Sequence, residues 1–126
     1  MKTRTFIIGD IHGADKALKQ ILERAGVSED DELIFLGDYV DGWSGSAAVI
    51  DQLIELQKTN RCIFIRGNHD VWCEEWLATG IANEIWLKHG GKATVESYAT
   101  YDTDSTLKHL HFFKQKMRNL KECNLC

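Results

Sequence analysis

The chain has 126 residues, a formal net charge of −4, and basic residues that are scattered along its length. This length fits one domain at most, and the scattered positive charge argues against nucleic acid or an anionic membrane as a partner. The N-terminus, residues 1–4, leads directly into a short apolar run without a long apolar segment or a small-residue cleavage site. We therefore expect no signal peptide, no membrane span and a cytoplasmic location.

The first half of the chain alternates between strand-like and helix-like segments. Three short apolar runs are typical of buried strands, namely residues 6–8, 33–36 and 62–65. Residues 14–25 carry apolar side chains at helical spacing and end at Gly26, and a second helix is predicted to open at residues 44–46. Residues 4–66 thus predict an α/β fold, with a β-α-β-α-β parallel sheet and right-handed crossovers.

The second half predicts short helices rather than strands. Helical spacing of apolar residues covers residues 71–78, 92–99 and 105–120, with glycine breaks at Gly80 and at residues 90–91. The last cysteines, Cys123 and Cys126, form a single C-x-x-C pair. Because a zinc site needs four ligands and no second pair is present, we expect no zinc there.

Each strand-like run is followed by a short polar block. The blocks are Gly-Asp-Ile-His-Gly at residues 9–13, Gly-Asp-Tyr-Val-Asp-Gly at 37–42 and Gly-Asn-His-Asp at 67–70. Any one of them alone reads as ordinary turn chemistry. All three follow strands, however, and ligands of open α/β sheets gather at the carboxyl ends of the strands. We therefore expect the blocks to converge there.

The side chains in these blocks suit transition-metal ions. Asp10 and His12 offer a carboxylate and an imidazole, which favour zinc, iron or manganese over calcium. Asp38 has two oxygens that could bridge two ions, and Asn68 has an amide oxygen for the second ion. Two metals about 3.5–4 Å apart stabilise the attacking and leaving oxygens of an in-line displacement. The grouping predicts a hydrolase of phosphate esters.

At this spacing, Asp-x-His-Gly, Gly-Asp-x-x-Asp and Gly-Asn-His-Asp resemble the calcineurin-like metallophosphoesterases. They are most similar to the Ser/Thr protein phosphatase branch, including its small bacterial and phage members. The resemblance covers the first 70 residues strongly and residues 86–98 loosely. It implies an αββα sandwich in which residues 1–126 are the N-terminal part of a single domain. The parallel sheet would be present, short helices would follow it, and the second sheet would be missing.

The resemblance also implies a metal assignment. Asp10 and His12 would hold one ion, Asp38 would bridge, and Asn68 would hold a second ion. The family uses two divalent ions (Mn, Fe or Zn), and its second sheet supplies further histidines to the second one. We therefore expect one well-held ion in this chain. An extended chain is expected to hydrolyse p-nitrophenyl phosphate faster than residues 1–126 alone.

The remaining roles are catalytic and substrate-binding. His69 would donate a proton to the leaving alkoxide and Asp41 would orient it, since histidine titrates near neutral pH. The family's usual phosphate-binding arginine after the second aspartate is replaced here by Gly42 and Trp43. Arg66 is the candidate to bind phosphate instead, with a structural salt bridge as the alternative. Trp43 is expected to pack over the second helix, with a place at the substrate mouth as the alternative.

Three further histidines match none of the family's ligand motifs, and surface or helix-face roles are expected for His89, His109 and His111. The leading functional hypothesis is a phosphoprotein phosphatase acting on phosphoserine, phosphothreonine or phosphotyrosine. A dinucleoside tetraphosphatase or another small-molecule phosphoesterase is the alternative enzyme. A third reading is a catalytically incomplete binding remnant. The partner is accordingly a phosphorylated protein or a small phosphoester.

Overall fold

The computed structural model describes residues 3–119. Its strands are β1 (Thr5–Ile8), β2 (Glu32–Phe35), β3 (Arg61–Ile65) and β4 (Met117–Arg118). They form one sheet in the order β1-β2-β3-β4, and every neighbouring pair is parallel. The predicted α/β class and the parallel β-α-β-α-β arrangement of the first half are confirmed.

The two predicted crossover helices are α1 (Asp15–Arg24) and α2 (Ser46–Thr59). They cover one face of the sheet, where alternate strand residues join the apolar side of α2 in the core. These residues include Phe6, Ile8, Leu33, Phe35 and Phe64 from the strands and Val49, Ile50 and Leu53 from α2. Alternation places Ile7 on the other face of the sheet, where it is 67% exposed. One face of the sheet is therefore the core and the other remains partly open.

The second half contains α3 (Asn68–Thr79), α4 (Glu84–Trp86), the π-helical turn η1 (Leu87–Gly91), α5 (Lys92–Ser97) and α6 (Thr103–Lys116). Helix α3 begins earlier than predicted, because Asp70 Oδ2 accepts the N–H of Gly67 at 2.8 Å and caps the first turn. Helix α6 ends earlier than predicted, because Met117 turns extended and pairs with Phe64 of β3. Leu120, Cys123 and Cys126 lie outside the described residues.

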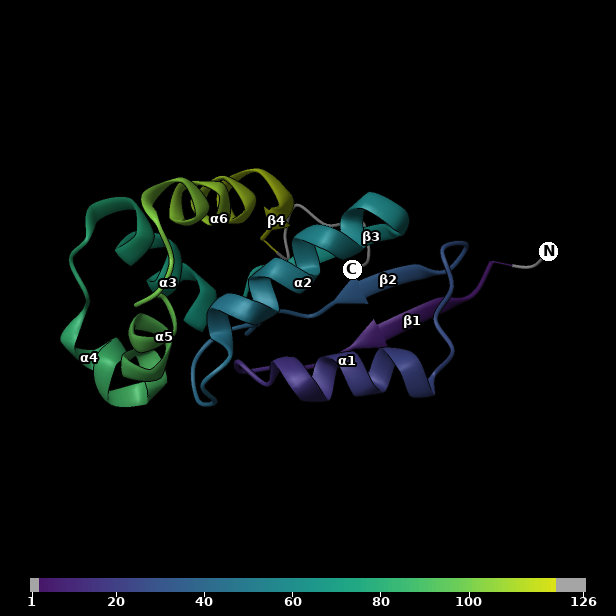
Figure 1. The fold of residues 1–126 in the computed structure, drawn as a ribbon, viewed down its shortest axis with the longest axis horizontal. Coiled ribbons are helices and arrows are strands. Elements are labelled where there is room, and N and C mark those ends of the chain that lie inside the picture. Colours follow the sequence, from purple (N-terminus) through teal and green to yellow (C-terminus); the bar gives the residue numbers. More distant parts are fainter. Residues whose placement is uncertain (1–2, 120–126) are drawn as a thin grey trace.

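The helices of the second half close the end of the sheet where the polar blocks lie. In Figure 1, β1 and β2 point toward the group formed by α3, α4 and α5. The turn η1 depends on its two glycines: Gly90 has a φ of +104°, and a Cβ on Gly91 would lie 2.4 Å from the Trp86 ring. Trp86 is fully buried as a result. None of the helices in residues 3–119 is long and apolar enough to cross a membrane.

An ion pair ties the start of β1 to the turn before β2. Arg4 donates from Nη2 to Asp31 Oδ2 at 2.8 Å and from Nε to Asp31 Oδ1 at 3.1 Å. The Asp31 carboxylate is 2% exposed and also accepts the backbone N–H of Ser28. These hydrogen bonds, that of Arg4 first, lower the pKa of Asp31 to about 2. The carboxylate is thus bound in its charged form.

This lowered pKa predicts a loss of stability in acid. Because the folded pKa is below the unfolded value of about 3.9, Asp31 stabilises the fold above that value. The contribution is lost as the pH falls from about 4 through about 2. Asp31→Asn should lower the urea midpoint at pH 7 and leave it closer to wild type at pH 2. Asp30→Asn, at the exposed neighbour, is the control. An equal deficit at both pH values would contradict the linkage.

Candidate metal centre

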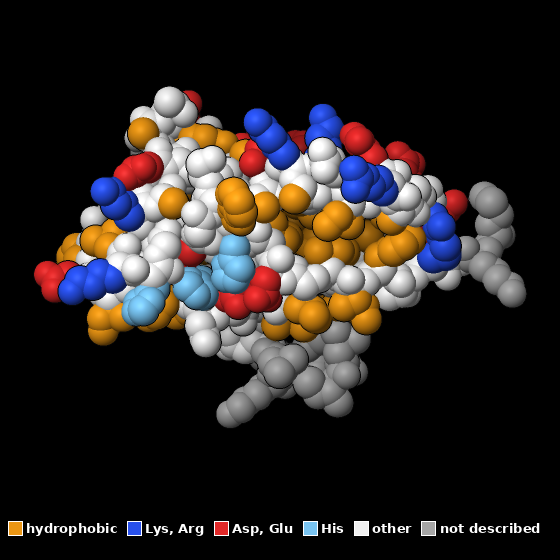
Figure 2. Space-filling view, turned by 90° about the horizontal axis from the view of Figure 1, so that it is seen from below, with side chains coloured by type: hydrophobic (Ala, Val, Ile, Leu, Met, Phe, Trp, Pro, Cys, Tyr) orange, Lys and Arg blue, Asp and Glu red, His pale blue; other side chains and the backbone are white. Residues whose placement is uncertain are grey.

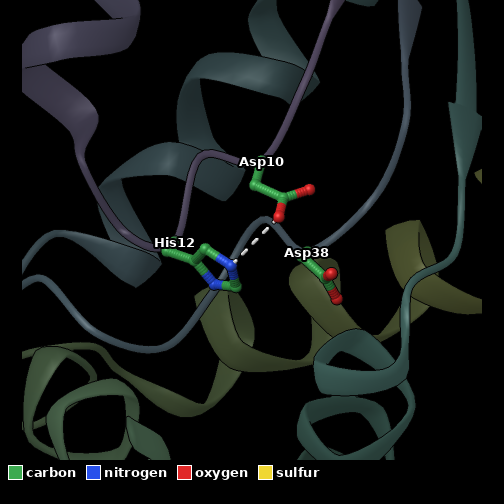
Figure 3. A group of neighbouring side chains, drawn as sticks. All are labelled: Asp10, His12 and Asp38. Carbon is green, nitrogen blue, oxygen red and sulfur yellow. Dashed lines mark ion pairs between the residues drawn. The ribbon is translucent and has the colours of Figure 1, made fainter.

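Three of the predicted ligands converge at the carboxyl end of the sheet. Asp10 follows β1, His12 lies in the same loop, and Asp38 lies in the loop after β2. One ligand atom from each lies within 4.8 Å of the others, and Figure 3 shows the three side chains facing a common space. The predicted convergence of Asp10, His12 and Asp38 is therefore confirmed. Their role as ligands remains a prediction.

The hydrogen bonds of His12 suit it to hold a cation. Its Nδ1 lies 3.0 Å from the carbonyl oxygen of Val40, which can only accept, so Nδ1 carries the proton. In the neutral ring Nε2 is then a lone-pair acceptor, yet it lies 3.5 Å from Asp10 Oδ2, another acceptor. Two acceptors facing each other need a cation or a proton between them. Metal-binding histidines commonly donate their other ring nitrogen in this way, so the residues fit a metal ion.

The backbone of the site is held in an unfavourable conformation. Among the described residues other than glycine, only His12, Asp38 and Asp41 have a positive φ, at +47°, +55° and +74°. The left-handed region costs about 1–2 kcal/mol for such residues, and strain of this kind clusters at functional sites. All three are residues that the sequence analysis assigned to the site. The backbone conformations that place these three side chains in the site therefore reduce the stability of the fold.

The start of α3 packs directly against Asp38. A Cβ on Gly67 would lie 2.2 Å from Asp38 Oδ1, so only glycine allows this approach. The backbone N–H of His69 donates to the same oxygen at 3.3 Å. Asn68 lies between these two residues and is exposed. The backbone of Asn68 therefore lies near Asp38, and its role as a ligand of a second ion remains a prediction.

Asp70 fixes the loop that carries Asp38, a role the sequence analysis missed. The Asp70 carboxylate is fully buried and accepts the N–H groups of Gly67, Asp38 and Tyr39 at 2.8, 2.7 and 2.9 Å. Burial raises its pKa to about 7, against the lowering effect of these three donors. One side chain thus joins the loop after β2 to the loop after β3. The adjacent Asn-His-Asp triplet was the available signal, but only the first two residues received roles.

His69 and Asp41 form a close pair beside the metal cluster. His69 Nδ1 lies 2.7 Å from Asp41 Oδ2, and the His69 and His12 rings meet edge to face at 5.2 Å between centroids. Asp41 is 1% exposed and the His69 side chain 27%. Figure 2 shows histidine side chains in a row beside acidic side chains on one face of the molecule. With Nδ1 directed at Asp41, Nε2 is the nitrogen through which His69 could transfer a proton.

The Asp41 carboxylate has two further donors from the second half of the chain. Trp86 Nε1 donates to Oδ2 at 2.6 Å, and Thr94 Oγ1 donates to Oδ1 at 2.5 Å. Thr94 Oγ1 also accepts the Asp41 N–H at 3.0 Å and lies 3.0 Å from Ser46 Oγ. Neither Trp86 nor Thr94 was predicted as a site residue. A buried carboxylate with this many donors is fixed in position.

Removing the Thr94 hydroxyl should therefore destabilise the protein. Thr94→Val keeps the shape but removes the hydroxyl donor to Asp41 Oδ1, which should cost about 1–3 kcal/mol, while the Asp41 N–H keeps Ser46 Oγ as an acceptor at 3.1 Å. Thr94→Ser keeps the hydroxyl and loses only a methyl group, so it should cost less. Urea unfolding of both variants measures the difference. If the valine variant is as stable as the serine variant, the network contributes nothing to the fold.

Some of the remaining predicted residues lie where they were expected and others do not. Arg66 pairs with Glu74 at 3.1 Å and donates to the Phe113 carbonyl oxygen at 2.8 Å, which is the structural alternative. Its phosphate-binding role stays a prediction. The expected packing of Trp43 over α2 is wrong, because this side chain is 69% exposed. His109 lies on α6 but is 1% exposed, bound between Tyr98 and Asp51.

His89 and His111 are exposed, as expected. The position of His89 is nevertheless informative. Its neighbour Gly90 packs closely against Asp41 and Gly42. A Cβ added to Gly90 would lie 3.0 Å from Asp41 Cβ and from Gly42 N. The turn that carries His89 therefore borders the site. Sequence spacing gave no sign of this, because the contact joins segments about 50 residues apart.

Comparisons with known proteins agree with this geometry. Residues 3–123 match the family described as calcineurin-like phosphoesterase. A bis(5′-nucleosyl)-tetraphosphatase (asymmetrical) of Anoxybacillus flavithermus is 30% identical over 105 residues, which cover 76% of this chain and 42% of that protein. The Ser/Thr-protein phosphatase PP2A-like PPG1 of Saccharomyces cerevisiae is 32% identical over 102 residues, which cover 79% of this chain and 27% of that protein.

A solved yeast Ser/Thr phosphatase with similarity to human phosphatase PP5 has the same fold, with a TM-score of 0.60 at 21% identity, covering 89% of this chain and 32% of that one. The chain thus spans less than half the length of these relatives. The family match extends over nearly the whole chain and includes all three polar blocks. The chain belongs to the calcineurin-like phosphoesterase family.

Proposed function

We propose that this chain acts in the metal-dependent hydrolysis of phosphate esters. The single observation that carries the proposal is the Asp10–His12–Asp38 cluster, in which two carboxylates and an imidazole each bring one ligand atom within 4.8 Å of the others. Divalent ions held there would supply positive charge to a phosphoryl group. The family match supports the same chemistry.

The chain's own residues would then position and protonate the substrate. Asp70 holds the Asp38 loop in place through backbone hydrogen bonds. Asp41 orients His69, whose Nε2 would give a proton to the departing oxygen. Asn68, one residue before His69, would add a neutral oxygen ligand. Manganese, iron and zinc are the metals that this donor set favours.

Two substrate classes follow from the resemblance and the relatives. The expected one is phosphoserine or phosphothreonine in a protein, as the yeast relative's name implies for that enzyme. The second is a dinucleoside tetraphosphate, as named for the Anoxybacillus relative. Both use the same metal cluster, so the cluster itself does not separate them.

An activity assay tests the proposal directly. The purified chain should release p-nitrophenol from p-nitrophenyl phosphate with added Mn²⁺, and EDTA should abolish the reaction. Asp10→Asn should remove most of the activity, whereas Asp104→Asn on α6 should not change it. Activity that survives both EDTA and Asp10→Asn would contradict the assigned site. A phosphothreonine peptide and diadenosine tetraphosphate, assayed side by side, compare the two substrate classes.

A further inference from the structure

Trp43 is an exposed aromatic side chain on a fixed loop. Its side chain is 69% exposed although an indole normally contributes a large apolar surface to the core. The backbone is held firmly, because the Trp43 N–H donates to the carbonyl oxygen of His12 at 2.9 Å. The Trp43 carbonyl packs against Gly13, where a Cβ would approach it to 2.6 Å. The backbone that carries the indole is therefore held against the loop that contains His12, a candidate metal ligand.

A cavity lies in front of this side chain. It has a volume of about 390 Å³ and is lined by residues 13–17, Trp43 and Ser44. It begins one residue beyond His12 in the first loop and two residues beyond Asp41 in the second. The cavity therefore adjoins the loops that carry His12 and Asp41, and a ligand whose phosphate lies at the cluster would extend into it with the group attached to the phosphate.

The lining has the chemistry of a platform for a flat, polar ring. Ala14 and Ala17 contribute small side chains to the lining, Ser44 and the exposed Lys16 offer hydrogen-bond donors, and Asp15 offers acceptor oxygens. A nucleobase has flat faces that stack on an aromatic side chain and polar edges that accept hydrogen bonds. Phosphoserine and phosphothreonine carry no flat group next to the phosphate.

We propose that Trp43 is a specificity-determining residue that stacks on the base of a nucleotide substrate, whose phosphate lies at the metal cluster. This inference rests on the proposed function and selects its second substrate class. Stacking of one base on an aromatic side chain contributes roughly 5- to 100-fold in affinity. The base should therefore add a measurable factor to binding of a sugar phosphate.

The test compares adenosine 5′-monophosphate with ribose 5-phosphate, which differ only in the base. Both are titrated calorimetrically into the Mn²⁺-loaded chain, its Trp43→Ala and Trp43→Phe variants, and Ile81→Ala, a control at a 76% exposed apolar residue away from the cavity. The wild type and the control should bind the nucleotide at least about 10-fold more tightly than the sugar phosphate. Trp43→Ala should reduce this ratio to about 1, and Trp43→Phe should keep part of it.

Three results would overturn the inference while leaving the proposed function in place. One is equal binding of both ligands by the wild type, and another is an unchanged ratio in Trp43→Ala. Tighter binding of a phosphothreonine peptide than of the nucleotide would also overturn it, in favour of a protein substrate. If neither adenosine 5′-monophosphate nor ribose 5-phosphate binds to the Mn²⁺-loaded chain, the proposed phosphate site is contradicted. The proposed stacking on Trp43, which rests on that site, is then contradicted as well.

Discussion

Asp38→Asn should weaken Mn²⁺ binding by at least about 100-fold, more than the 10- to 100-fold that loss of an outer hydrogen-bonding partner costs. The substitution replaces one of the two carboxylates in the cluster with a neutral amide and so removes negative charge that would hold the ion. The fold should tolerate it, because asparagine is nearly isosteric and accepts the left-handed backbone that Asp38 adopts. The loss should therefore appear in metal affinity and not in stability.

Calorimetric titration of Mn²⁺ into the metal-free chain gives the affinity, and urea unfolding gives the stability. Asp104→Asn, an exposed carboxylate on α6, is the matched control and should bind the metal like the wild type. The titration also reports how many ions bind, which tests the expectation of one well-held ion. Equal Mn²⁺ affinity in the wild type and in Asp38→Asn would remove Asp38 from the metal site.

His69→Asn should lower kcat for an alkyl phosphate by about 10²–10⁴-fold, the usual contribution of a general acid. Asparagine can still donate a hydrogen bond to Asp41, but it cannot transfer a proton at neutral pH. Metal content should remain close to that of the wild type, because His69 is proposed as a proton donor and not as a ligand. Asp41→Asn should do less, since Asp41 acts only through His69.

The leaving group provides the diagnostic measurement. With p-nitrophenyl phosphate, whose leaving group departs without help from an acid, the loss in His69→Asn should be much smaller. His111→Asn, at an exposed histidine of α6, should leave both substrates unaffected. Full activity of His69→Asn on the alkyl phosphate would refute the proton-donor role. An equal loss on both substrates would instead indicate that His69 positions the phosphate.

The sequence predicted the parts of this structure that depend on local pattern. The strands around residues 6–8, 33–36 and 62–65 are short apolar runs bounded by glycine, and the first two helices have a clear apolar side. Strand β4 could not be found this way, because two residues carry no detectable alternation. The early start of α3 depends on a cap from Asp70, whose side chain could equally have served a turn.

The site was predictable where its residues follow neighbouring strands of one sheet, and not where contacts between distant loops complete it. Asp10, His12 and Asp38 follow strands whose carboxyl ends share one edge, so their convergence followed from topology. Trp86 and Thr94 reach Asp41 across about 50 residues, and no spacing rule connects them. The predicted packing of Trp43 over α2 was wrong because the prediction followed the general tendency of tryptophan to be largely buried, whereas Trp43 is exposed.

The bonds from Trp86 and Thr94 to Asp41 separate the site into two thermodynamic units. The Asp10–His12–Asp38 cluster depends on β1, β2, the loops that follow them and the Asp70 carboxylate of α3, whereas the alignment of His69 depends on residues 84–97 through Asp41. Short helices of this kind open locally at lower free energy than the central strands. A sub-global opening of α4, η1 and α5 would leave the metal ligands assembled but the proton donor unaligned. The local opening equilibrium of α4, η1 and α5 would then set the fraction of molecules in which His69 is aligned for acid catalysis, whether or not metal is bound.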